Sequence, residues 1–312
     1  MKNDRKKKLK KILWGSRGTG GIIRLAALYV LLVGISFIFL YPLLQMLINS
    51  FMSLEDLIDP TTIWIPRKIV IANYQKAIAV LNFGKAFRDS MTVALWPTVI
   101  GVISSSVIGY GFAHYDFPGK KICLSVLVAV FLLPTLLMSI PTYVIYSDLK
   151  MLGSLKAYIY PALTGFGLRQ SVFILIFYQF FKMVPAELSE SAEVDGANSL
   201  QVFLKIAIPM VIPAYIICIL YSFVWYWNET TLAITYFKGR YTTLQIALNQ
   251  FESIYRQLYP SGNIGLGSAD ALLNQGVLFA GTTLSILPLL ILYVFTQKWF
   301  VESADRAGIA GD

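Results

Sequence analysis

Charged side chains are scarce in this sequence. Asp, Glu, Lys and Arg make up 14% of its 312 residues, whereas soluble domains carry about 25%. Hydrophobic residues account for 56%, and the mean hydropathy is +0.64. This balance indicates a multi-pass membrane protein. The formal net charge of +9 is not read as a nucleic-acid signal, because Lys and Arg of membrane proteins gather in cytoplasmic loops.

Residues that hold metals or perform acid–base chemistry are also rare. His114 is the single histidine, and Cys123 and Cys218 are the two cysteines. Both cysteines lie inside apolar runs, where they are typical of small buried hydrophobes. We therefore expect no metal site, no disulfide framework and no histidine-based catalytic centre.

A nucleotide-binding loop is missing as well. The "GTGG" stretch near the start lacks the Gly-Lys-Ser/Thr that completes a phosphate loop. We expect the chain not to be an enzyme and to hold no ATP, Mg²⁺ or other cofactor of its own.

Long apolar windows predict an all-α membrane protein with six transmembrane helices. A window of about 18 uncharged residues crosses the hydrocarbon core as a helix, which satisfies its own backbone groups. Six windows qualify, the fourth interrupted by Arg169: 25–54, 90–113, 122–147, 157–181, 206–228 and 271–297.

The distribution of Lys and Arg predicts the orientation. Nine of them lie in the first 24 residues, ahead of an apolar run that is too long for a signal peptide. With this leader inside, cytoplasmic segments carry 15 Lys and Arg and external segments carry ten. We expect both termini in the cytoplasm, with a leader at 1–24, a transmembrane domain at 25–298 and a tail at 299–312.

Small residues and prolines mark two of the windows. Gly101, Ser105 and Gly109 recur at four-residue spacing in the second window, which favours close approach of another helix. Pro134 and Pro141 in the third window each remove a backbone donor and predict kinks.

The segment 185–213 is unusually polar for a connection between two apolar windows. Pro185 suits the first turn of a helix, acids follow near its start, and Gly196 is a typical helix terminator. Asn198 and Gln201 have the spacing of a capping box for a second helix. Its expected apolar face is Leu200, Phe203, Leu204, Ala207 and Ile208.

Such a helix–glycine–helix unit presents side chains to a partner. It could rest on lipid headgroups, as an ordinary surface helix does. Its acids argue against that interpretation, because the inner leaflet is itself anionic. A protein partner fits the charge better.

Two motifs carry a family resemblance. "ESAEVDGA", followed by Ile208-Pro209, resembles the Glu-Ala-Ala loop of ABC importer permeases, with Ser191 in place of the middle alanine. "FVWYWNE" (223–229) resembles a motif of carbohydrate permeases similar to the second permease of the maltose transporter. The tail "VESADRAGIAGD" is similar to tails of that family, but it lacks their usual basic ending.

The resemblance implies a permease subunit in the plasma or inner membrane that imports a sugar or oligosaccharide. Its implied partners are ABC ATPase subunits that bind ATP and Mg²⁺, a second homologous permease, an extracytoplasmic solute-binding protein and membrane lipid. In such permeases the loop docks on the ATPase. The implied coupling residues are Glu190 and Asp195 as polar contacts, Ala192, and Gly196 as the bend.

Candidate residues for the substrate path are polar or aromatic groups in the apolar windows or at their ends. Arg169 is the one charge inside a window, and such charges are functional hypotheses; it could instead snorkel to the outer interface or pair with an acid. Aromatic faces can stack on sugars, but Trp and Tyr also occur at membrane interfaces without any ligand. The candidates are Arg169, Trp225, Trp227, Asn228, Glu229 and Tyr143.

Two other classes compete with the importer. A secondary transporter driven by an ion gradient often needs intramembrane acids, and the six windows contain none. A membrane enzyme would need clustered His, Cys or acids, which the windows also lack.

Overall fold

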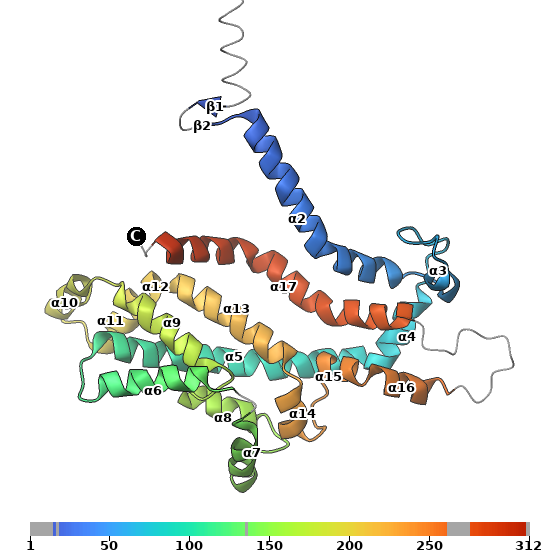
Figure 1. Ribbon diagram of the computed structural model, residues 1–312. Helices are drawn as coiled ribbons and strands as arrows, with labels where there is room; N and C mark the ends of the chain where they lie inside the picture. The colour runs from blue at the N-terminus through green and yellow to red at the C-terminus, as the bar shows by residue number, and fades with distance from the viewer. Residues whose placement is uncertain (1–14, 17–18, 135–136, 261–274, 310–312) are drawn as a thin grey trace, which may run out of the picture. The chain divides into compact units, whose positions relative to one another are not determined.

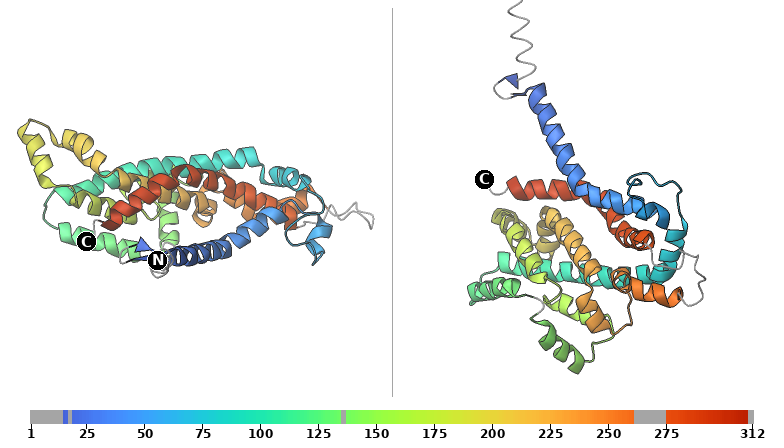
Figure 2. Two further views of the ribbon diagram at one scale, coloured as in Figure 1. Left: turned by 90° about the horizontal axis from the view of Figure 1, so that it is seen from above. Right: turned by 45° about the vertical axis from the view of Figure 1, so that its right-hand side comes forward.

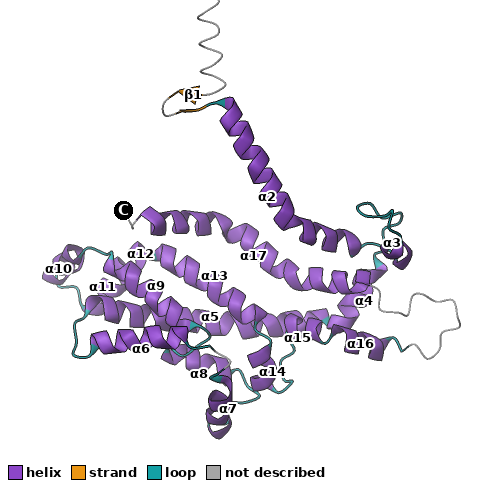
Figure 3. Ribbon diagram, viewed as in Figure 1, coloured by secondary structure: helices purple, strands orange, loops and turns teal. Residues whose placement is uncertain are grey.

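The computed structural model describes residues 15–16, 19–134, 137–260 and 275–309 (Figure 1). The regular secondary structure of these residues is helical, apart from the short antiparallel strands β1 (Gly15–Ser16) and β2 (Thr19–Gly20) (Figure 3). The helices are α2 (Ile22–Asn49), α3 (Leu54–Ile58), α4 (Ala72–Leu81), α5 (Phe83–His114), α6 (Lys120–Leu132), α7 (Ser139–Asp148), α8 (Lys156–Thr164), α9 (Gln170–Lys182), α10 (Ala186–Val194), α11 (Ser199–Val202), the π-helix η1 (Phe203–Ala207), α12 (Ile208–Met210), α13 (Ile212–Asn228), α14 (Thr231–Phe237), α15 (Leu244–Asn249), α16 (Phe251–Leu258) and α17 (Gln275–Ile309).

Three helices of the described chain are long and apolar enough to cross a membrane. They are α2, α5 and the Gln275–Trp299 part of α17. Two bent helix pairs raise the number to as many as five: Gln170–Lys182 with Ala186–Val194, bent by 71°, and Ser199–Met210 with Ile212–Asn228, bent by 78°. The prediction of an all-α protein with several apolar spans is confirmed.

Three of the predicted windows are interrupted. The fifth bends at Val211, between α12 and α13. The third divides into α6 and α7, and α6 ends at Leu132, just before Pro134. The residue before a proline disfavours helical geometry, which explains the end of α6. The fourth window divides into α8 and α9, because Gly165 (φ +86°) and Arg169 (φ +50°) take left-handed conformations.

The described chain forms two compact units. Unit 1 comprises the described residues of Met1–Ala77 and Ser261–Thr283. In it, the turn after α2 is held by Asn73, whose amide donates to the carbonyls of Ser50 (3.0 Å) and Met52 (2.9 Å). A Cβ at Gly276 would lie 2.8 Å from the Asn73 amide nitrogen. Glycine therefore lets the start of α17 reach this turn.

Unit 2 comprises Ile78–Pro260 and Leu284–Asp312 and contains the main core. Helix α5 is central to this unit and packs against α8, α9 and α13 (Figure 1, Figure 2). The buried aromatic rings of this core come mainly from α9: Phe173, Phe177 and Phe181. Ala207 at the end of η1 packs on the same core, which ties the segment after Gly196 to the helix bundle.

The predicted small-residue stripe is confirmed on α5. Gly101, Ser105 and Gly109 are all buried. A Cβ at Gly109 would lie 2.6 Å from Phe177 Cβ and 2.9 Å from the backbone nitrogen of Tyr178. Helix α9 thus approaches α5 as closely as a glycine allows.

Candidate coupling surface and substrate path

Helix α10 ends in a Schellman motif centred on Gly196. Gly196 has φ +88°, its N–H donates to Glu193 O (3.0 Å), and the Ala197 N–H donates to Ala192 O (2.9 Å). This pair of bonds satisfies two terminal carbonyls of α10 and requires the left-handed conformation that glycine adopts freely. The expected helix terminator at Gly196 is confirmed.

The second half of the segment begins with the expected capping box. Asn198 Oδ1 accepts the Gln201 N–H at 2.9 Å, and Gln201 Oε1 accepts the Asn198 N–H at 2.9 Å. The helix then widens into η1, an uncommon form that recurs at functional sites. This wider turn changes the buried face: Val202 and Ala207 are buried.

The expected apolar face was therefore wrong for Leu200 and Leu204, which are exposed in this chain. Leu200 precedes η1 and lies two residues, about 200° around the helix, from the buried Val202. The wider turn of η1 then places Ala207, five residues after Val202, on the buried side and leaves Leu204 off it.

Asn198→Ala is expected to loosen this second helix. Loss of an N-cap side chain destabilises a helix start by about 1 kcal/mol, which corresponds to roughly fivefold faster amide exchange at 199–203. Hydrogen exchange on the membrane-embedded protein measures this. Asn198→Asp keeps the acceptor and is the matched control. Equal exchange in Asn198→Ala and the unaltered protein would contradict the capping role.

The coupling surface, defined here as residues 186–204, lies at one end of unit 2, beyond the ends of α5 and α9 (Figure 1, Figure 2). Glu190, Asp195 and Gly196 are exposed on it, and Ala192 is half-buried. Val194 is 88% exposed beside these acids. Val194 was not among the predicted coupling residues, although an exposed apolar residue at the end of a polar helix is typical of a protein contact.

A hollow of about 420 Å³ lies where α10 meets the ends of α5 and α9. Glu190, Glu193 and Lys182 contribute charge to its lining, while Tyr110 and His114 contribute aromatic rings stacked at 5.0 Å. The buried Tyr110 hydroxyl has no hydrogen-bond partner among the described residues. This lining suits a partner group that carries positive charge and hydrogen-bond donors.

The loop that follows α5 is fixed by a charged pair outside the apolar helix. Lys120 Nζ donates to Asp116 Oδ1 at 2.8 Å and to Tyr115 O at 3.0 Å. The hydrogen bond from Lys120, and then its charge, hold the pKa of the Asp116 carboxyl below its ordinary value. This pair orders the backbone next to His114.

The break between α8 and α9 places two predicted substrate-path residues together. The guanidinium carbon of Arg169 lies 5.1 Å from the ring centroid of Trp225. On α9, the Phe173 ring lies 5.2 Å from the same indole. Arg169 is exposed and Trp225 is half-buried, so this pair forms a cation–π contact at the surface of unit 2.

The other predicted path residues in this region make contacts of a different kind. Trp227 is 1% exposed and packs near the rings of Phe87 and Phe223, so in this conformation it has no surface to offer a sugar. Asn228 donates to Val224 O (3.0 Å), and Glu229 accepts the Leu232 N–H (2.9 Å) at the start of α14.

Tyr143 on α7 lies under a different cation. Lys238 Nζ is 5.6 Å from its ring centroid. The structure thus brings Arg169 and Trp225 together and leaves Tyr143 in a separate cation–π pair.

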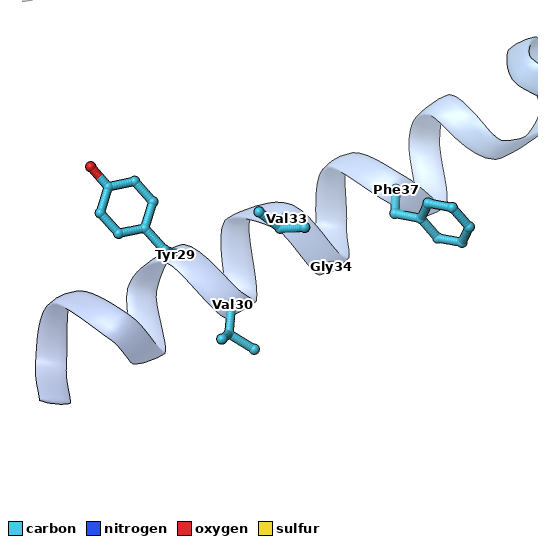
Figure 4. A pocket seen from close by; sticks show the side chains of 5 residues that line it. All are labelled: Tyr29, Val30, Val33, Gly34 and Phe37. Atoms are coloured by element: carbon cyan, nitrogen blue, oxygen red, sulfur yellow. The ribbon is translucent and has the colours of Figure 1, made fainter.

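Helix α2 of unit 1 carries a second hollow, of about 520 Å³ (Figure 4). It is lined by Tyr29, Val30, Val33, Gly34 and Phe37, and no residue of α2 is buried. Apart from the Tyr29 hydroxyl this lining is apolar, so it suits lipid or an apolar helix and not a sugar.

Comparison with known proteins agrees with a membrane protein built of apolar helices. Residues 105–306 match the family described as the binding-protein-dependent transport system inner membrane component. Because this match covers more than half of the chain, the chain belongs to that family, a transport component of the inner membrane and not a catalytic one.

Individual relatives cover most of the chain. An osmoprotective compounds uptake permease, GgtD of Synechocystis, is 28% identical over 88% of this chain and 89% of its own length. A polygalacturonan/rhamnogalacturonan transport permease, YtcP of Bacillus subtilis, is 28% identical over 91% and 97%. A solved chain from a bacterial ABC transporter that imports the acidic polysaccharide alginate has the same fold, with a TM-score of 0.68, 22% identity and coverage of 88% and 96%.

Proposed function

We propose that the chain is one permease subunit of an ATP-driven ABC importer for a sugar or oligosaccharide. The observation that carries this proposal is the exposed helix–Gly196–helix surface, which is built by a Schellman motif and a capping box and has acids on its outer face. Family membership supports the same function. Among its relatives, AraQ of Bacillus subtilis is named for arabinooligosaccharides and AglG of Rhizobium meliloti for alpha-glucosides.

The proposed topology has six spans and cytoplasmic termini. Helices α2, α5, α13 and α17 provide four spans, while α6 with α7 and α8 with α9 provide two interrupted ones. This arrangement keeps the Lys- and Arg-rich leader inside. It also puts the coupling surface on the cytoplasmic side, with 1–24 as leader, 25–298 as the transmembrane domain and 299–312 as tail.

The proposed partners follow from this arrangement. ABC ATPase subunits dock on Glu190, Ala192, Asp195 and Gly196 and bind ATP and Mg²⁺, so this chain needs no cofactor. A second homologous permease completes the pathway, and an extracytoplasmic binding protein delivers the sugar. Closure of the ATPases then moves the spans between inward- and outward-facing states as a rigid-body switch.

Purification of the tagged chain from its own membranes, with mass spectrometry of what accompanies it, tests the proposal. We expect an ABC ATPase and a second permease in stoichiometric amounts. A chain that purifies alone and transports in liposomes under an ion gradient would instead establish the secondary transporter.

A further inference from the structure

The break between α8 and α9 is held by buried polar groups. The Gly167 N–H donates to Gln170 Oε1 (2.7 Å), and the Leu168 N–H donates to the Tyr226 hydroxyl (3.0 Å). The other end of the Gln170 side chain donates to the carbonyls of Gly101 (3.0 Å) and Ala162 (2.9 Å). Gln170 and Tyr226 are 2% and 3% exposed. Irregular backbone within a membrane protein persists where it is buried or lines a watery cavity.

This network forces Arg169 into a strained conformation. Arg169 has φ +50°, a left-handed geometry that is unfavourable for a residue other than glycine. Strain of this kind lasts when surrounding contacts over-determine it, and it points to a functional site. Here the contacts come from α5, α8 and α13, so three helices fix where the Arg169 backbone lies.

The Arg169 side chain is positioned but not neutralised. Its guanidinium lies over Trp225, and none of the ion pairs within the described residues involves Arg169. A guanidinium over a ring keeps N–H donors at its edge, and their fork geometry matches a carboxylate. An isolated charge in an otherwise apolar window of a membrane protein is a functional hypothesis.

We infer that Arg169, stacked on Trp225, is a recognition site for the carboxylate of an acidic oligosaccharide, one that contains uronic acid units. The guanidinium binds the carboxylate bidentately, and the neighbouring aromatic edge contacts the sugar ring. This inference rests on the proposed function, because it names the substrate class of that pathway. It assigns Trp227 to the core and not to the sugar.

The test uses the complex of this chain with its co-purifying subunits, in nanodiscs and without binding protein. The probes are two- to four-unit oligomers of galacturonate, glucuronate and mannuronate, each paired with its methyl ester, which removes the charge and keeps the ring. Equilibrium binding is measured for the unaltered complex and for Arg169→Gln and Arg169→Lys. Lys238→Gln is the matched control, since it removes another cation that lies over a ring.

We expect at least one acid to bind about tenfold more tightly than its ester. Arg169→Gln should abolish the preference for the acid and leave ester binding within about twofold. Arg169→Lys should retain part of that preference, and Lys238→Gln should retain it fully.

Equal binding of acid and ester by the unaltered complex, or an equal loss of both in Arg169→Gln, overturns the inference. So does binding of neither form of any probe. Loss of the second permease from the Arg169→Gln complex also overturns it, because Arg169 would then be a subunit contact. Failure of the proposed function is read separately, from absence of an ATPase in the unaltered preparation.

Discussion

Gly109→Ala should destabilise the helix bundle by about 3 kcal/mol. The new methyl group would lie 2.6 Å from Phe177 Cβ, 2.9 Å from Tyr178 N and 3.1 Å from Ile174 O. Two of these neighbours are backbone atoms of α9, which cannot rotate away as a flexible side chain does. The helices must separate, and the packing around Phe177 is lost. Thermal unfolding of the purified protein should show a fall of roughly 6–12 °C.

Two other glycines of α5 are matched controls. A Cβ at Gly101 would lie 3.6 Å from Ala162 Cβ, an ordinary contact, and a Cβ at Gly111 would have no neighbour within 4 Å. Alanine at Gly111 should leave stability unchanged or raise it by up to about 1 kcal/mol through helix propensity. If Gly109→Ala unfolded at the same temperature as Gly111→Ala, the close contact of α5 with α9 would be disproved.

Local geometry was predictable from the sequence because its causes lie a few residues apart. The Gly196 terminator and the Asn198–Gln201 capping box each need only the residues within one helical turn. The small-residue stripe on α5 was readable as a pattern. Its partner, α9, was not, because the pattern shows that a helix approaches and not which helix does.

The break before α9 was not predicted, because the residues that hold it are far apart in the sequence. Its hydrogen bonds join Gln170 to Gly101 and Leu168 to Tyr226, residues 69 and 58 positions apart. A hydropathy profile scores each side chain separately. The adjacent Arg169 and Gln170 in an apolar window therefore did not indicate a broken helix. The turn of η1 was missed likewise, since a π-helix has no sequence period that separates it from an α-helix over five residues.

Gly196→Val should uncouple ATP hydrolysis from transport in the assembled importer. A Cβ at Gly196 would meet no atom within 4 Å, so crowding is not the cause. The cause is φ +88°, a backbone conformation that a β-branched residue disfavours. Helix α10 would lose its Schellman closure, and Glu190, Ala192 and Asp195 would no longer be held in place relative to α11. Substrate uptake per ATP hydrolysed should fall by about tenfold or more, measured in proteoliposomes with all subunits present.

Gly119→Val separates this effect from general backbone strain. Gly119 is also exposed, has φ +86°, and would also place a Cβ in open space. It lies in the loop before α6, outside the coupling surface. Its replacement therefore imposes similar backbone strain without changing the direction of α10. Gly196→Asn, which tolerates the left-handed region better, should keep part of the coupling. Equal uncoupling by Gly119→Val would attribute the effect to strain alone. Normal uptake in Gly196→Val would mean that the bend at Gly196 is not what transmits ATPase closure to the spans.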